Sequence, residues 1–167
     1  MNGRGDASSS LSEVIAYVAL GSNLGDRERM LGTARADIEA LPGTRILACS
    51  VVEETEPIGP VEQPSYLNQM LAVATTLTPH SLLDALLEIE RRAGRVRESQ
   101  RWTARTLDCD IVRYGEVEID DDRLTIPHPE LRNRDFWQRE LGEIEASLRS
   151  GAEATCERNW VSSERST

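Results

Sequence analysis

Lysine is absent from this sequence: all 19 basic residues among its 167 are arginine, against 29 acidic residues. The net charge of −10 argues against general binding to nucleic acid or anionic membranes, because both require a broadly basic surface. Aromatic residues make up only 4% of the chain, so the core must come from leucine, isoleucine, valine and alanine. A single domain of this length can bury such a core without disulfides or a structural metal.

Other absences bear on compartment and on cofactor class. The three cysteines, Cys49, Cys109 and Cys156, are an odd number without CxxC or metal-ligand spacing, which predicts free thiols in a reducing cytosol. No apolar run approaches the ~20 residues of a membrane span, and the first residues lack the apolar segment of a secretory signal. GxGxxG and Walker motifs are also missing. We therefore expect a cytoplasmic protein that would hold any nucleotide without a P-loop.

The hydrophobic pattern predicts one α+β domain. Residues 1–12 are expected to be a disordered extension, residues 13–149 the domain, and residues 150–167 a polar tail. Strands are predicted over 14–20, 45–54, 67–77 and 107–114, and helices over 27–41 and 78–93. After these, the pattern predicts a weaker hairpin over 116–120, a loop or short helical turn over 127–136 and a last helix over 140–149. The order strand, helix, strand, strand, helix, strand is that of a ferredoxin-like split β-α-β fold, an antiparallel sheet with helices packed on one face.

Positive charge gathers between Gly94 and Ile111, directly before two aspartates. On a strand, Asp108 and Asp110 point to the same face, where they can hold Mg²⁺ together with phosphate oxygens. The alternative is a pair of solvated aspartates on an edge strand, although aspartate is depleted in strands. Guanidinium groups bind phosphate bidentately, so arginines beside metal-binding acids indicate a polyphosphate substrate, of which ATP is the simplest.

The arginines themselves have two interpretations. Arg91 and Arg92 fit a helix C-terminus, where cations offset the helix dipole. Arg97, Arg101 and Arg105 lie beyond Gly94, in a loop that leads to the acidic strand, and this position favours phosphate contact. Trp102 in the same loop can fill the core or stack on a flat ring.

Four segments in register resemble the 6-hydroxymethyl-7,8-dihydropterin pyrophosphokinase family of the folate pathway. They are VALGSNLGD (18–26), GPVEQPSYLNQM (59–70), GRVRESQRWTARTLDCDI (94–111) and RLTIPHPELRNRDF (123–136). The resemblance covers residues 14 to about 145. It implies transfer of pyrophosphate from MgATP to the hydroxymethyl group of the pterin, with release of AMP and with two Mg²⁺ ions at the acidic pair.

The resemblance also implies roles for individual residues. The catalytic set would be Arg95, Arg97, Arg105, Asp108 and Asp110, with both aspartates as metal ligands. The pterin would contact Gly21, Thr55, Ile58, Tyr66, Asn68, Trp102 and Phe136. ATP would contact Glu90, Arg97, Arg101, Trp102, Arg105, Ile111, Arg123, Thr125, His128 and Arg134. Taken singly, Tyr66 fits a core aromatic better, and His128 is more often a loop histidine than a general base. Glu90 fits a solvated helix carboxylate equally well.

The chain departs from the family pattern at three places. Thr103-Ala104 replaces a Gly-Pro pair in the arginine loop, and Glu56 stands where a proline is common. After Phe136, the polar segment WQRELGEIEASL replaces an apolar, proline-containing one, so the packing of the C-terminal part is expected to differ.

Two other function classes stay open at this point. One is a metal-dependent nucleotidyl- or glycosyltransferase with another acceptor, which would bind nucleotide without preferring a pterin. The other is a ferredoxin-like binding module whose acidic surface meets a basic protein. In each case, a compact domain of this size is expected to be a monomer. It is expected to bind neither nucleic acid nor a membrane.

Overall fold

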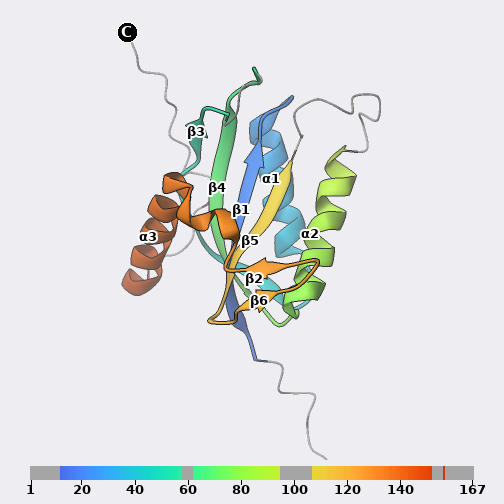
Figure 1. Ribbon diagram of the computed structural model, residues 1–167, viewed down its shortest axis with the longest axis vertical. Helices are drawn as coiled ribbons and strands as arrows, with labels where there is room; N and C mark the ends of the chain where they lie inside the picture. Colours follow the sequence, from blue (N-terminus) through green and yellow to red (C-terminus); the bar gives the residue numbers. More distant parts are fainter. Residues whose placement is uncertain (1–11, 58–61, 95–106, 152–155, 157–167) are drawn as a thin grey trace, which may run out of the picture.

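A computed structural model describes residues 12–57, 62–94, 107–151 and 156. Its main sheet has the strand order β2-β4-β1-β5, with β3 also paired to β4. The strands are β1 (Val14–Ser22), β2 (Thr44–Cys49), β3 (Glu53–Thr55), β4 (Tyr66–Thr75) and β5 (Asp108–Tyr114). All pairs in this sheet are antiparallel, and this arrangement confirms the predicted ferredoxin-like fold (Figure 1).

The helices α1 (Arg27–Glu39) and α2 (Pro79–Gly94) cover one face of the sheet, as predicted. Asp26 caps α1, because its side chain accepts a hydrogen bond from the backbone N–H of Arg29. Leu31 and Ile38 of α1 and Leu86 of α2 are fully buried in the core that this face forms. Alternate residues of β1 point into the same core, which is the period-two pattern of a half-buried strand.

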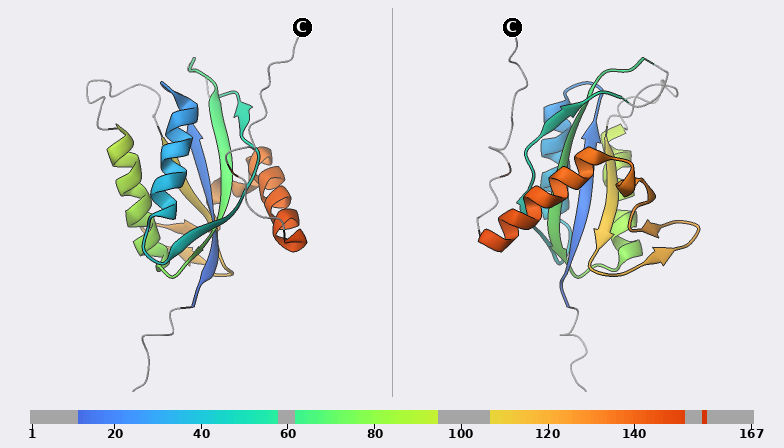
Figure 2. Two further views of the ribbon diagram at one scale, coloured as in Figure 1. Left: turned by 180° about the vertical axis from the view of Figure 1, so that it is seen from behind. Right: turned by 60° about the vertical axis from the view of Figure 1, so that its left-hand side comes forward.

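A third helix, α3 (Asp135–Ser150), lies across the opposite face (Figure 2, right view). Trp137, Leu141 and Ile144 are spaced so that they share one side of α3, and they pack on small residues of the sheet such as Ala19 and Ala72. The sheet is therefore covered on both faces, and the prediction that the helices pack on one face is correct for α1 and α2 but wrong for α3.

Three predicted boundaries need correction. The expected strand over 45–54 is divided into β2 and β3, because Ser50 leaves the ladder: its hydroxyl and its N–H both bond the backbone of Met70. The last helix begins at Asp135 instead of Glu140, since its apolar spacing already starts at Trp137. The hairpin predicted over 116–120 extends further, because it pairs β6 (Ile119–Asp120) with β7 (Thr125–Ile126), whereas the short helical turn predicted within 127–136 is present as η2 (Pro129–Arg132).

The prediction of three free thiols is wrong for two of them. Cys49, at the end of β2, and Cys156 form a disulfide with their Cα atoms 5.3 Å apart. They are separated by 107 residues, so their spacing in the sequence carries no sign of the contact. Cys109 is free and buried. Among the described residues, no helix is long and apolar enough to cross a membrane.

Candidate functional site

A cavity of about 160 Å³ opens on the α3 face of the sheet, beside the start of α3. Eight of the residues that the sequence singled out line it: Gly21, Thr55, Tyr66, Asn68, Asp108, Asp110, Arg134 and Phe136. They come from four strands and from the start of α3, so segments far apart in the sequence meet at one place. The antiparallel register of the strands brings the strand residues among them together.

Cross-strand pairing sets the floor of the cavity. Gly21 on β1 lies between Asn68 on β4 and Asp108 on β5, while Ala19 lies beside Asp110. A Cβ atom added to Gly21 would stand 3.4 Å from Oδ1 of Asn68 and 3.6 Å from the Tyr66 ring. The cavity therefore lies over two small residues of β1, Ala19 and Gly21. A glycine at this place permits close approach of a ligand to the backbone.

The acidic pair lies on the cavity side of β5, as the period-two argument predicts. Cys109 between the two aspartates points into the α1/α2 core, where burial, followed by the nearby carboxylates of Glu90, Asp110 and Asp108, raises the pKa of its thiol well above the usual value. The thiol therefore stays protonated and cannot compete as a metal ligand. No cluster of three or more metal-binding side chains occurs in the described part of the chain, so the acidic donors at this place are two.

A site with two carboxylates and open space for waters and phosphate oxygens suits Mg²⁺, which is rarely enclosed by protein ligands alone. Mg²⁺ is commonly held by one or two carboxylates, with waters and substrate phosphates completing an octahedron. Asp108 and Asp110 are both partly exposed at the cavity wall and supply that number of donors.

His128 joins the acidic pair to α3. Its Nδ1 accepts a hydrogen bond from the backbone N–H of Glu130 at 3.0 Å, so the proton of the neutral ring lies on Nε2. That Nε2 is 3.7 Å from a carboxylate oxygen of Asp110. The ring also stands edge-on to Trp137, with their centroids 5.0 Å apart.

Arg134 is held on the other side of the same tryptophan. Its guanidinium carbon lies 4.5 Å from the centre of the Trp137 ring, a cation–π arrangement that leaves the guanidinium edge at the cavity. Nε of Arg134 is buried without a hydrogen-bond partner in the described structure. The α3 start therefore brings a cation and two aromatic rings to the cavity.

The residues predicted for the pterin form the opposite wall. Nδ2 of Asn68 donates to the hydroxyl of Thr55 at 2.6 Å, which orients the amide and turns its oxygen toward Gly21. Asn68 is almost fully buried, whereas Tyr66 and Phe136 are half-buried at the rim. An oriented amide between two aromatic side chains suits a flat, polar-edged ring.

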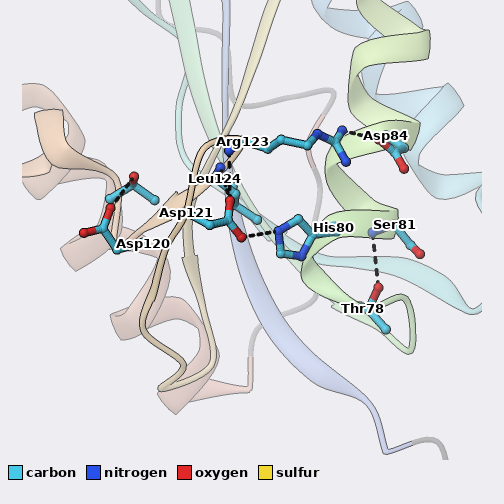
Figure 3. Close-up of polar contacts among 9 residues, drawn as sticks. Thr78, His80, Ser81, Asp84, Asp120, Asp121, Arg123 and Leu124 are labelled. Carbon is cyan, nitrogen blue, oxygen red and sulfur yellow. Dashed lines mark hydrogen bonds and ion pairs between the residues drawn. The ribbon is translucent and has the colours of Figure 1, made fainter.

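The residues predicted for the nucleotide are only partly brought together. Arg123 and Thr125 belong to the hairpin that follows β5, where Arg123 pairs with Asp84 on α2, and the neighbouring Asp121 bonds His80 at 2.8 Å (Figure 3). The hydrogen bond from the backbone N–H of Arg123, and after it the His80 contact, lower the pKa of Asp121. These polar contacts tie the hairpin to α2.

Two further nucleotide predictions are placed differently from the expectation. The side chain of Ile111 is buried in the α1/α2 core, which leaves its main chain as the part that can reach a ligand. A carboxylate oxygen of Glu90 accepts a hydrogen bond from the backbone N–H of Cys109 at 2.7 Å. Six predicted residues lie outside the described residues: Ile58, Arg95, Arg97, Arg101, Trp102 and Arg105.

Sequence reasoning missed the role of Trp137 and of Gln63. Trp137 holds both His128 and Arg134, and Gln63 lines the cavity while accepting a hydrogen bond from Asn23 at 3.1 Å. The apolar period of α3 could have revealed a buried Trp137. No local signal marks Gln63, because its contact spans 40 residues.

Comparisons with known proteins agree with this geometry. Residues 17–146 match the family described as 7,8-dihydro-6-hydroxymethylpterin-pyrophosphokinase. Proteins named 2-amino-4-hydroxy-6-hydroxymethyldihydropteridine pyrophosphokinase are similar: that of Methylorubrum extorquens is 42% identical over 142 residues, covering 85% of this chain and 89% of the relative. That of Haemophilus influenzae is 43% identical over 135 residues, covering 81% and 84%.

Among solved structures, the HPPK-DHPS protein of Plasmodium falciparum has a similar fold. The TM-score is 0.62 at 17% identity, and the match covers 81% of this chain and 41% of that one. At this identity the likeness concerns the fold alone.

Proposed function

Because the chain belongs to the 7,8-dihydro-6-hydroxymethylpterin-pyrophosphokinase family, we propose that it transfers pyrophosphate from MgATP to the hydroxymethyl group of 6-hydroxymethyl-7,8-dihydropterin, with release of AMP, in folate biosynthesis. The observation that carries the proposal is one cavity lined both by the amide and aromatic side chains expected for a pterin and by Asp108 and Asp110. A transfer between two substrates requires both sets within reach of each other.

The pterin wall positions the acceptor. Asn68, with its amide oriented by Thr55, would read the amide-like edge of the ring, and Tyr66 and Phe136 would hold its two faces. This orientation would direct the hydroxymethyl group toward β5. Holding the reacting groups in line is a large part of phosphoryl-transfer catalysis, since the protein adds little covalent chemistry.

The acidic wall is proposed to hold two Mg²⁺ ions through Asp108 and Asp110. Bound there, Mg²⁺ would supply charge neutralisation for the triphosphate and would favour loss of the proton from the hydroxyl group. Nε2–H of His128 and the guanidinium of Arg134 lie beside the pair and can donate to phosphate oxygens. Arg95, Arg97, Arg101 and Arg105 are proposed as further phosphate contacts, with Trp102 and Ile58 at the substrates, on the family resemblance alone.

The two rival classes make different predictions for one assay. Purified protein is incubated with MgATP and 6-hydroxymethyl-7,8-dihydropterin, and AMP is followed over time. We expect AMP in proportion to pterin consumed, and none with 6-methyl-7,8-dihydropterin, which has no hydroxyl group to attack. A nucleotidyl- or glycosyltransferase would bind ATP with no pterin requirement, and a binding module would release no AMP. Either result would contradict the proposal.

We also propose that the enzyme works as a monomer in the cytoplasm, without nucleic acid or membrane. Its acidic net charge of −10 supports the last two points. The Cys49–Cys156 disulfide points the other way on compartment, since disulfides are rare in reducing compartments. Alkylation of thiols during cell lysis, followed by mass spectrometry, would measure its oxidised fraction in cells, and size-exclusion chromatography with light scattering would measure the mass.

A further inference from the structure

Glu90 stands where the last turns of α2 meet the acidic strand. Its Oε1 accepts a hydrogen bond from the backbone N–H of Cys109 at 2.7 Å, and Cys109 is the residue between Asp108 and Asp110. The contact is partly buried and joins residues 19 positions apart. A carboxylate on a helix thus bonds the main chain of the strand that carries both acidic side chains.

The contact lies at the edge of the sheet as far as the structure describes it. β5 pairs with β1 on one side only, and it is the last strand in the order β2-β4-β1-β5. In an antiparallel pair, the backbone N–H groups of successive residues point alternately toward the partner strand and away from it. The N–H of Cys109 points away from β1 and would have no strand to bond, so Glu90 takes the place of a missing neighbour.

Cys109 is consequently fixed on two sides. Its side chain is buried in the α1/α2 core, and its N–H is bonded to Glu90. The pleat at Cys109 sets the relative direction of the side chains before and after it. Asp108 is the first residue of β5, so the bond at Cys109 lies next to the end of the strand.

We propose that Glu90 is a positioning residue for the acidic pair: by accepting from the N–H of Cys109 it holds Asp108 and Asp110 in the arrangement that binds Mg²⁺. The inference rests on the proposed function for the identity of the metal and deepens it. It gives Glu90 a role distinct from the predicted contact with ATP. Partners that orient metal ligands commonly matter about 10- to 100-fold in metal affinity when removed.

The role requires an acceptor oxygen and not a negative charge, and this requirement makes it testable. Glu90→Gln keeps an oxygen at the same place, whereas Glu90→Ala removes it. Glu88→Ala is a matched control, because it removes a carboxylate two residues away that pairs with Arg91 and Arg92 on the exposed side of α2. Circular dichroism and thermal unfolding of each variant establish that it is folded.

The first measurement needs no turnover. Hydrogen–deuterium exchange at the Cys109 amide should quicken by about tenfold or more in Glu90→Ala, the change expected when a hydrogen bond to a charged group is lost, and should stay near the wild-type rate in Glu90→Gln and Glu88→Ala. The second is binding of Mn²⁺, followed by electron paramagnetic resonance in the presence of a non-hydrolysable ATP analogue. Its dissociation constant should rise about tenfold in Glu90→Ala only.

Three outcomes overturn the inference. Unchanged exchange in Glu90→Ala means that the bond does not hold the strand. Quickened exchange with unchanged Mn²⁺ binding means that the bond is structural alone. Loss of Mn²⁺ binding in Glu90→Gln as severe as in Glu90→Ala means that the charge of Glu90 acts directly on the metal or nucleotide. If the wild-type protein releases no AMP in the assay above, the proposed function fails, while the exchange result still decides whether Glu90 holds β5.

Discussion

The pterin wall and the acidic wall of the cavity lie on either side of β1, yet they are held in different ways. On the pterin wall, Asn68 is buried and already bonded to Thr55 at 2.6 Å. On the acidic wall, Asp110 keeps 39% of its side chain exposed, with His128 at 3.7 Å as a loose neighbour. The pterin wall is fixed by a hydrogen bond within the protein, whereas Asp110 on the acidic wall stays accessible to solvent.

The difference follows from what each wall is proposed to bind. A neutral ring is recognised by shape and by oriented hydrogen bonds, which a packed sheet provides before the ligand arrives. A metal–phosphate complex is recognised by charge, and close pairing of the aspartates with protein cations would compete with it. Arg123 likewise does not pair with the acidic wall, because in this structure it is paired with Asp84.

The largest expected effect comes from removing a carboxylate of the acidic wall. Asp110→Ala should lower AMP release by about a thousandfold, because the metal site loses half of its carboxylates and several kcal/mol of transition-state stabilisation. Steady-state assays at saturating substrates measure it. Asp122→Ala, on the exposed hairpin, is the control. Retention of more than a tenth of the activity would mean that the acidic wall is not the metal site.

The next test concerns the protonation of Glu140 on α3, the helix that also carries Phe136 to the pterin wall. Glu140 is 1% exposed, and burial, followed by hydrogen bonding to Glu53 and repulsion from it, raises its pKa to about 10. Among the described residues, an ionised Glu140 would have no donor, whereas a protonated one can donate to Glu53, which Arg139 also contacts.

The direction in which the free energy of unfolding changes with pH follows from proton binding. Above the usual pKa of 4.5 the unfolded chain loses this proton and the folded chain keeps it, so the free energy of unfolding falls as pH rises toward about 10. The slope contributed by this group is about 1.4 kcal/mol per pH unit. Glu140→Gln should remove it, as urea unfolding at pH 6, 7 and 8 would measure.

The control for this slope is Glu143→Gln, an exposed change on the same helix. Its amide keeps an oxygen that can accept from the backbone N–H of Val51, as the Glu143 carboxylate does at 3.0 Å. Because Glu140 stays buried in this variant, the wild-type slope should persist. Equal slopes in all three proteins would contradict the assignment.

A smaller effect is expected at the rim of the pterin wall. Phe136→Ala should raise the KM for pterin by roughly 5- to 100-fold, the range expected for loss of one stacked ring, and should change the KM for ATP less than about twofold. Phe136→Tyr keeps the ring and serves as the control. If both KM values rise together, the two walls are not independent and the comparison fails.

The smallest effect should come from the hairpin. Arg123→Ala is expected to raise the KM for ATP only about two- to fourfold, because its partly exposed guanidinium is paired with Asp84 and lies outside the cavity. Asp84→Ala releases the arginine without removing it. If ATP draws Arg123 away from Asp84, that variant should bind ATP slightly more tightly than the wild type, in a fluorescence titration with an ATP analogue.

Local pattern was enough to predict much of the fold. The apolar runs of β1, β4 and β5 and the helical spacing of α1 and α2 are properties of short segments. The division at Ser50 was not predictable, because it depends on hydrogen bonds to Met70, 20 residues away. The early start of α3 was missed because the pattern of residues 127–136 was assigned to a loop or short helical turn, although Trp137 already belongs to the helical period.

The sequence by itself determined, through the alternation of a strand, that Asp108 and Asp110 share a face, and it predicted which residues carry chemistry. Its similarity to a known family supplied the pterin set. Only the tertiary structure decided that Gly21 stands between Asn68 and Asp108, that Glu90 bonds the strand edge, that Glu140 is buried and that Cys49 meets Cys156. The physical reason is that periodicity is written within a few residues, whereas register, burial and pairing are set by contacts between segments that the chain brings together only on folding.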